Sequence, residues 1–219
     1  MDAVDTLGRR LAQRLGAVVV LVEYRLAPER RFPGAVEDAW TVTCWAARQT
    51  WVLGKHELPI VVAGDSAGGN LAAAVAQRSS WFSDGPRVAL QVLAYPALNC
   101  DFTTDSYLDP ENGVLISRDM MIWLWDQYVP CIEMRRRRDA CPLLGAVGGE
   151  MPPGIVLTAE HDVLRSEGVA YANALAEARA LVAHRQFPGQ IHGFFTMVGL
   201  LSAHDDALDY IVTETQSIL

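Results

Sequence analysis

One serine of the sequence lies in a glycine-rich run whose spacing suits covalent catalysis. Ser66 follows an apolar stretch, sits in Gly64-Asp65-Ser66-Ala67-Gly68, and is followed by an alanine-rich stretch. This fits the pattern G-x-S-x-G, in which a sharp strand-to-helix turn lifts the hydroxyl clear of a sheet. The N–H of Ala67 would then point at an oxyanion formed beside Ser66. A phosphate-binding loop is the competing interpretation, but no lysine follows at the Walker position and G-x-G-x-x-G is absent.

A serine nucleophile needs a base and a group that orients the base, and two later loops supply candidates. Asp162 follows the apolar run 154–159, and His192 follows the run 182–187. His192 can accept the Ser66 proton through one ring nitrogen while Asp162 keeps the other nitrogen protonated. The competing bases are His161, His184 and His204, and the competing acid is Glu160.

Short apolar runs alternate with longer helical patterns along the chain. Strands are predicted at 17–22, 59–63, 88–94, 154–159 and 182–187, and helices at about 2–15, 35–50, 68–78, 117–129, 166–180 and 203–217. This alternation predicts an α/β fold with a mostly parallel sheet and helices on both faces, in a single domain over 1–219. Ligands of such sheets bind beyond the carboxyl ends of the strands, where the candidate serine, aspartate and histidine all lie.

Composition excludes several other classes of protein. The 219 residues are 51% hydrophobic and carry 26 acidic against 18 basic side chains, a formal net charge of −8. This balance disfavours nucleic-acid binding, and the run Arg135–Arg138 is expected to be a solvated loop. No segment approaches the roughly 20 apolar residues that span a bilayer. The first residues lack the pattern of a secretory signal, so we expect a cytoplasmic protein.

The cysteines give no sign of a metal or redox centre. Cys44, Cys100, Cys131 and Cys141 form no C-x-x-C pair and lie near no paired histidines. A zinc site is therefore not expected, and free thiols in a reducing compartment are.

Seven motifs in order resemble the hormone-sensitive-lipase-like branch of the α/β-hydrolases, which includes many bacterial carboxylesterases. They are Tyr24-Arg25-Leu26-Ala27-Pro28-Glu29, Phe32-Pro33-Gly34-Ala35-Val36-Glu37-Asp38, the run 64–70, Tyr95-Pro96, Pro142-Leu143-Leu144, Asp162-Val163-Leu164-Arg165-Ser166-Glu167-Gly168 and His192-Gly193-Phe194. The resemblance implies that Ser66, Asp162 and His192 are nucleophile, acid and base. It also implies a small ester with a short or medium acyl chain, no cofactor, and pairing into a homodimer through the last strand and helix.

The sequence departs from this family at one motif. The family carries an H-G-G-G loop whose glycine N–H groups complete the oxyanion hole, and no His-Gly-Gly occurs here. Residues 1–7 resemble the helix that follows that loop. We therefore expect the loop, the first strands and the cap helices upstream of Met1, where a signal peptide could also lie. The Ala67 N–H is then the only obvious oxyanion donor, and strands 17–22 and 59–63 each lack a neighbour.

The leading hypothesis is a serine carboxylesterase that works through an acyl-enzyme. The alternative is a non-catalytic protein that holds a small molecule in a hydrolase pocket, which the absent H-G-G-G loop favours. A peptidase on the same fold is a third hypothesis, disfavoured by the signatures at 24–29 and 162–168. Tyr95, Trp123, Trp125, Phe194 and Phe195 are candidate pocket walls or core residues.

Overall fold

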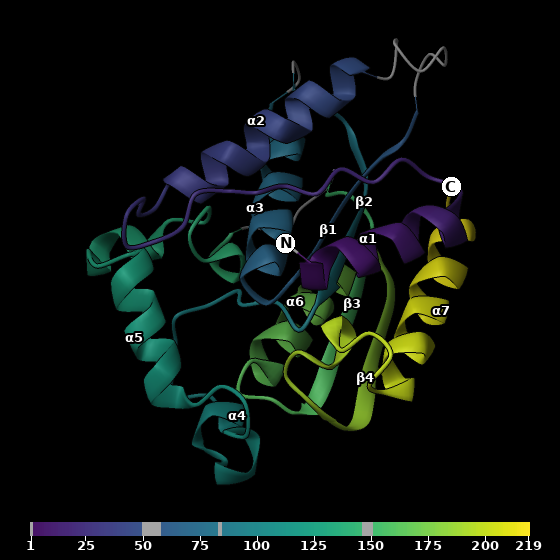
Figure 1. The fold of residues 1–219 in the computed structure, drawn as a ribbon. Helices are drawn as coiled ribbons and strands as arrows, with labels where there is room; N and C mark the ends of the chain where they lie inside the picture. Colours follow the sequence, from purple (N-terminus) through teal and green to yellow (C-terminus); the bar gives the residue numbers. More distant parts are fainter. Residues whose placement is uncertain (1, 50–57, 83–84, 146–150) are drawn as a thin grey trace.

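A computed structural model describes residues 2–49, 58–82, 85–145 and 151–219. Its strands are β1 (Ile60–Asp65), β2 (Val88–Ala94), β3 (Gly154–His161) and β4 (Leu181–Ile191). Its helices are α1 (Asp2–Leu15), α2 (Gly34–Gln49), α3 (Ser66–Trp81), α4 (Asp105–Leu108), α5 (Arg118–Tyr128), α6 (Arg165–Glu177) and α7 (Ser202–Gln216). The strands form one parallel sheet in the order β1-β2-β3-β4 (Figure 1).

The central strands are apolar on both faces because helices cover both sides of the sheet. Successive side chains point to opposite faces of a strand. Leu93 of β2 and Val156 of β3 therefore pack with α3 and α6, in a cluster that includes Tyr171. Their neighbours along the same strands, such as Val92 and Leu157, pack on the other face with α7 and α1. Each fully buried leucine of this kind contributes roughly 1.5–3 kcal/mol to folding.

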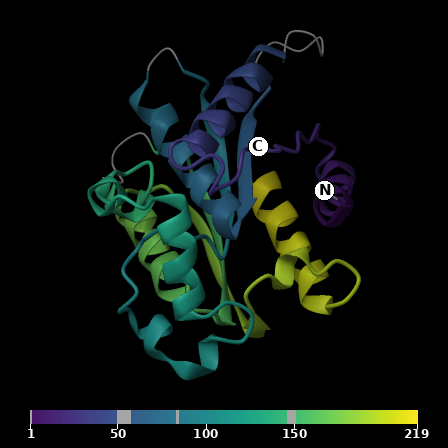
Figure 2. The ribbon, with the colours of Figure 1, turned by 60° about the vertical axis from the view of Figure 1, so that its left-hand side comes forward.

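Two helices form outer layers. The first, α1, packs against α7, where Arg10 and Arg14 pair with Asp205 and Asp209 at 2.7 and 2.5 Å; Figure 2 shows α1 outside α7. The second, α2, lies across α3, and its buried Val36 joins a small apolar cluster with α3 (Figure 1). The sheet is thus held between layers, and the carboxyl ends of its strands stay together at one edge.

The predicted helices and four of the five predicted strands are confirmed within a few residues. Residue 50, the end of predicted helix 35–50, lies outside the described residues. The short helix α4 was missed because four residues are too few to give a periodic signal.

The predicted strand at 17–22 is wrong. These residues are extended but pair with no strand of the described chain, and β1 pairs with β2 alone among the described strands. Val18 is 70% exposed, so the segment is not buried either. An apolar run becomes a strand only where a neighbour accepts its backbone hydrogen bonds, and none of the described strands lies beside this one.

The expectation of a solvated loop at Arg135–Arg138 is wrong for its first residue. Arg135 is only 8% exposed, donates to the carbonyl of Val129 at 2.7 Å, and pairs with Asp126 at 2.5 Å. The other three arginines are exposed. The Val129 carbonyl and the Asp126 carboxylate offset the cost of removing the guanidinium from water, since a buried charge needs such partners.

Candidate active site

The serine lies at a strained turn between β1 and α3. Strand β1 ends at Asp65 and α3 begins at Ser66, whose φ of +50° is unusual for a residue other than glycine. The turn is tight: a Cβ at Gly64 would lie 2.2 Å from the carbonyl oxygen of Gly68, and one at Gly69 would lie 2.8 Å from a Pro96 side-chain carbon. Glycine at these positions lets the strand and helix approach closely enough to project the Ser66 hydroxyl.

The aspartate lies after β3 and is fully buried. One carboxylate oxygen of Asp162 accepts the N–H of Leu164 at 2.9 Å, and the other lies 2.8 Å from Nδ1 of His192. The backbone bond fixes the rotation of the carboxylate, so its second oxygen faces the imidazole ring.

The histidine follows β4 and connects the other two residues. Its Nε2 lies 2.9 Å from the Ser66 hydroxyl oxygen, and His192 itself is 6% exposed. Since a carboxylate only accepts, Nδ1 carries the ring proton and Nε2 is free to take the serine proton. Gly193 comes next with φ +82°, a left-handed turn that directs the chain back toward the core. The structure thus brings Ser66, His192 and Asp162 into one hydrogen-bonded series.

Two neighbours shape the surroundings of this series. The ring of Tyr95 lies 4.7 Å from the His192 ring, centroid to centroid, and limits the tilt of the imidazole. Burial raises the pKa of the Tyr95 hydroxyl, so it stays neutral. Burial also raises the pKa of the Asp65 carboxyl, which the nearby His192 ring opposes.

The competing acid and bases have other partners. Glu160 accepts the N–H of Gly189 at 2.6 Å and so fixes the loop that leads to His192. His184 lies 3.1 Å from the hydroxyl of Thr158. His161 lies 3.9 Å from the Glu160 carboxylate, and His204 packs against Phe195 and contacts its carbonyl. Among the described histidines, His192 is the one within hydrogen-bond distance of Ser66.

Four of the five candidate pocket aromatics are buried in packed clusters. Tyr95, Phe194 and Phe195 belong to the cluster of α7, and Trp125 belongs to the cluster that covers the end of β3. Trp123 is the exception, at 58% exposed. Apart from Tyr95, which touches the imidazole, the buried members have contacts typical of core residues.

The amino end of α3 can support a negative charge. Ser66 and Ala67 are its first two residues, and no side chain caps the amides of this end. The first N–H groups of a helix have no partner within the helix and carry a partial positive charge. This arrangement supports the prediction that the Ala67 N–H is an oxyanion donor, which stays a prediction.

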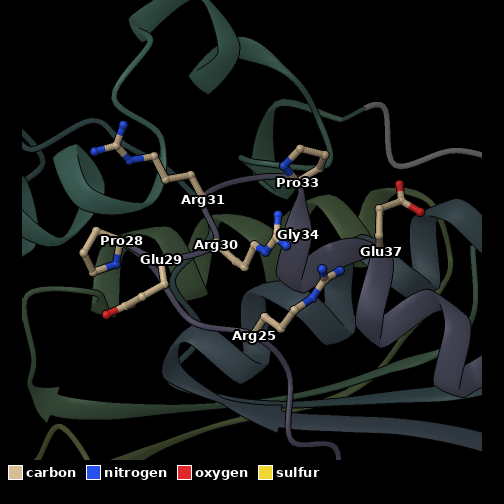
Figure 3. Close-up of a pocket in the computed structure, with 8 residues that line it drawn as sticks. All are labelled: Arg25, Pro28, Glu29, Arg30, Arg31, Pro33, Gly34 and Glu37. Atoms are coloured by element: carbon tan, nitrogen blue, oxygen red, sulfur yellow. The ribbon is translucent and has the colours of Figure 1, made fainter.

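A cavity of about 490 Å³ is formed by residues that precede α2 and by the first turn of that helix (Figure 3). It is lined by Arg25, Pro28, Glu29, Arg30, Arg31, Pro33, Gly34 and Glu37. The Arg25 guanidinium is already paired with both carboxylate oxygens of Asp38, the shortest contact being 2.7 Å. No triad residue lines this cavity, so it does not supply the reacting groups.

Two further features concern the whole chain. Within the described ranges, no helix combines the length and apolar character needed to cross a membrane. The same residues contain no group of three or more His, Cys, Asp or Glu side chains placed to hold a metal ion.

Some of the contacts that position the side chains of the site were not predicted from the sequence. The Glu160–Gly189 bond and the ring contact between Tyr95 and His192 join segments about 29 and 97 residues apart, and no local pattern marks such pairs. Glu167 was noticed only as part of a motif, yet its buried carboxylate accepts the Leu98 N–H at 2.7 Å.

Comparison with known proteins gives consistent matches. A family model described as an α/β hydrolase fold matches residues 1–196. The chain is 34% identical to an ethyl acetate hydrolase of Pseudomonas putida over 219 residues, covering all of this chain and 69% of that protein. It is 32% identical to the carboxylesterase NlhH of Mycobacterium tuberculosis over 210 residues, covering 94% of this chain and 66% of that protein.

Solved structures agree with these relatives. The thermostable carboxylesterase EstE1, cloned from a metagenomic library, matches with a TM-score of 0.91 and 38% identity, over 98% of this chain and 74% of that chain. An esterase from the archaeon Pyrobaculum calidifontis matches with a TM-score of 0.89 and 38% identity, over 98% of this chain and 72% of that one. The chain thus spans about two thirds to three quarters of the length of these proteins. The fold, the turn at Ser66 and the family match over residues 1–196 agree. The chain therefore belongs to the α/β-hydrolase family, in its carboxylesterase-like branch.

Proposed function

We propose that the chain hydrolyses carboxylic esters with Ser66 as nucleophile, His192 as base and Asp162 as the group that orients the base. The observation that carries this proposal is the continuous series of contacts from Ser66 Oγ through His192 to Asp162, at 2.9 and 2.8 Å. The relatives named as esterases support the choice of esters as the substrate class.

The geometry supports a two-step reaction. His192 Nε2 takes the Ser66 proton as Oγ attacks the ester carbonyl, and the oxyanion is stabilised by the Ala67 N–H. The imidazolium is stabilised by Asp162 and then protonates the leaving alcohol, which leaves an acyl-enzyme on Ser66. Water, deprotonated by His192, attacks the acyl carbonyl and releases the acid with regeneration of the serine.

Short and medium acyl chains are the substrates we propose. The name of the ethyl acetate hydrolase, to which the chain is similar over its whole length, supports the short end of that range. We further propose a single domain over 1–219, a cytoplasmic location and a homodimer. The four free cysteines support the location. The last strand, β4, is hydrogen-bonded to one strand only among those described, which leaves an edge for pairing.

Hydrolysis of p-nitrophenyl acetate, butyrate and octanoate, beside butyryl p-nitroanilide, tests this function. We expect turnover of the esters, fastest for acetate or butyrate, and little or none of the anilide. Turnover should disappear in Ser66→Ala and persist in Ser79→Ala, a matched serine of α3 whose hydroxyl donates to the Ala76 carbonyl. Stoichiometric binding of an ester without turnover would instead support a non-catalytic binding protein, and faster anilide cleavage would support a peptidase.

A further inference from the structure

Two cysteines outside the triad lie in one apolar cluster. Cys100 follows the loop after β2 and is partly buried, whereas Cys141 is fully buried directly before Pro142. Both pack in the cluster that also contains Tyr107 and Leu164. Neither thiol has a role in the proposed ester hydrolysis. A function of the two cysteines would therefore be separate from that reaction.

Backbone contacts hold the two segments side by side. The side-chain amide of Asn70, on α3, donates to the carbonyls of both Ala97 and Ala140, at 2.7 and 2.9 Å. The Leu143 N–H donates to the Leu98 carbonyl at 3.1 Å. These contacts place the two segments side by side, with Cys141 directly after Ala140 and Cys100 two residues after Leu98.

The two thiols are chemically unequal. The hydrogen bond from Cys141 lowers the pKa of the Cys100 thiol, and the guanidinium of Arg135 lowers it further. The same hydrogen bond raises the pKa of the Cys141 thiol, and burial raises it as well. A partly accessible thiol with thiolate character beside a second, protonated thiol is the arrangement found in peroxide-sensing cysteine pairs.

We propose that Cys100 and Cys141 form a peroxide-reactive site that closes into a reversible disulfide. The Cys100 thiolate attacks one oxygen of hydrogen peroxide, which gives a sulfenic acid at Cys100 and, with one proton, a molecule of water. The Cys141 sulfur then attacks the Cys100 sulfur and forms the disulfide, and the sulfenic oxygen leaves as a second water with the Cys141 proton. Two electrons pass from the thiol pair to the peroxide, and a dithiol reductant restores both thiols.

The position of the pair gives the bond a structural consequence. It would join the loop after β2 to the segment before Pro142, which at present are connected through the amide of Asn70. The disulfide would add a covalent link between the two segments that Asn70 bridges by hydrogen bonds. Oxidised protein should therefore unfold at a higher temperature than reduced protein.

The remaining cysteines serve as internal controls. Cys131 is exposed, and its thiol contacts the carboxylate of Glu133 at 3.1 Å rather than a second thiol. Cys44 lies on α2 and belongs to a different part of the fold. Neither has a second thiol within its described contacts.

Peptide mapping after oxidation tests the proposal. The reduced chain is treated with equimolar hydrogen peroxide, alkylated with N-ethylmaleimide and digested with trypsin without reductant. Cleavage after arginine places Cys100 in peptide 88–118, Cys141 in 139–165, Cys131 in 119–135 and Cys44 in 32–48. We expect peptides 88–118 and 139–165 joined, two hydrogen masses below their sum, and the other two alkylated. The joined pair should disappear after dithiothreitol.

Variants sharpen the test. Cys131→Ser should leave the joined pair unchanged, whereas Cys141→Ala should stop at a Cys100 sulfenic acid that dimedone traps. Ser66→Ala should form the pair as fast as the parent chain, so the outcome is independent of ester hydrolysis. Recovery of both peptides in alkylated form after peroxide, or joining of Cys131 or Cys44 in preference, would overturn the proposal.

Discussion

Asp162 shows how one side chain can serve two partners at once. Its oxygens contact the Leu164 N–H and His192 Nδ1, so the carboxylate fixes both the loop and the ring tautomer. In Asp162→Asn the amide group can turn its NH₂ toward Nδ1, which forces the ring proton onto Nε2 and blocks proton transfer from Ser66. We expect kcat for p-nitrophenyl butyrate to fall about 10⁴-fold with little change in fold by circular dichroism.

Glu160→Gln is the matched control for that substitution. It changes a carboxylate two residues away, whose contact is the Gly189 N–H rather than the imidazole. The amide oxygen of glutamine can still accept that bond, so kcat should change less than about 10-fold. A larger loss in Glu160→Gln than in Asp162→Asn would reverse the assignment of the acid.

Glu167 links protonation to stability. It is 2% exposed, one oxygen accepts the Leu98 N–H, and burial raises the pKa of its carboxyl well above the usual range. The folded state therefore keeps a proton that the unfolded state releases above about pH 4.5. Stability linked to this group is complete below that pH and is lost as the pH rises toward the folded pKa.

Glu167→Gln tests this linkage. Glutamine keeps an oxygen for the Leu98 N–H but cannot ionise, so the variant should lose less stability than the parent chain between pH 5 and pH 8. Urea unfolding at both values gives the two differences in free energy. Equal pH dependence in the parent chain and the variant would show that Glu167 does not titrate as argued.

At this scale, residue types and strand-end positions were enough to select Ser66, Asp162 and His192 as a set. Residue types and positions did not reveal the contacts that hold these three side chains in place. Tyr95 and Glu160 contact partners that are distant in sequence and come close only in the folded chain. Sequence spacing reports on neighbours along one element, whereas a ring contact between the residue after β2 and the loop after β4 depends on how the strands lie side by side.

The turn from β1 into α3 illustrates how an element places a reactive group. A Cβ at Gly64 would meet the Gly68 carbonyl oxygen at 2.2 Å, whereas a Cβ at Gly68 would meet nothing closer than the Asp65 carboxylate at 4.0 Å. Gly64→Ala should therefore force the turn open, with a loss of about 1–3 kcal/mol and of ester turnover. Thermal unfolding and the p-nitrophenyl assay measure the two effects.

Gly68→Ala provides the comparison within the same turn. Gly68 lies inside α3, where alanine is the better helix former, so the variant should unfold at the same temperature as the parent chain or higher. If the two variants were equally unstable, the close approach at Gly64 would not be the reason for its glycine.

The segment 17–22 shows where an apolar pattern misleads at the level of an element. Five valines and leucines with one alanine are typical of a buried strand, yet Val18, Val20 and Leu21 are all more than 40% exposed. β propensity reports fitness for a half-buried pleated surface and depends on the partner strand. The mainly apolar run 88–94 did form β2, because β1 and β3 pair with it on both sides.

The first and last helices of the chain pack in one apolar cluster. Leu7 of α1 and Val212 of α7 belong to the same apolar cluster as Leu157 of β3. A cluster that draws on both ends of the sequence should melt as one unit, as the proposed single domain requires. Thermal unfolding followed by tryptophan fluorescence and by far-ultraviolet circular dichroism should give coincident curves; two separated transitions would indicate two units.

The parallel sheet and its helices were predictable because strand–helix alternation leaves one simple arrangement for a chain of this size. The position of the triad at the carboxyl edge follows from that arrangement. The packing of α1 against α7 was not predictable, since it brings together residues 195 positions apart, such as Arg10 and Asp205.

The most direct test of the catalytic assignment is reaction with a fluorophosphonate, which modifies a serine only when a base activates it. The treated chain is digested with trypsin and peptide 56–78, which contains Ser66, is examined by mass spectrometry. We predict a single phosphonyl adduct on Ser66, absent in Ser66→Ala and much slower to form in His192→Ala. An unmodified Ser66, or an adduct on another residue that persists in Ser66→Ala, would contradict the assignment of the nucleophile.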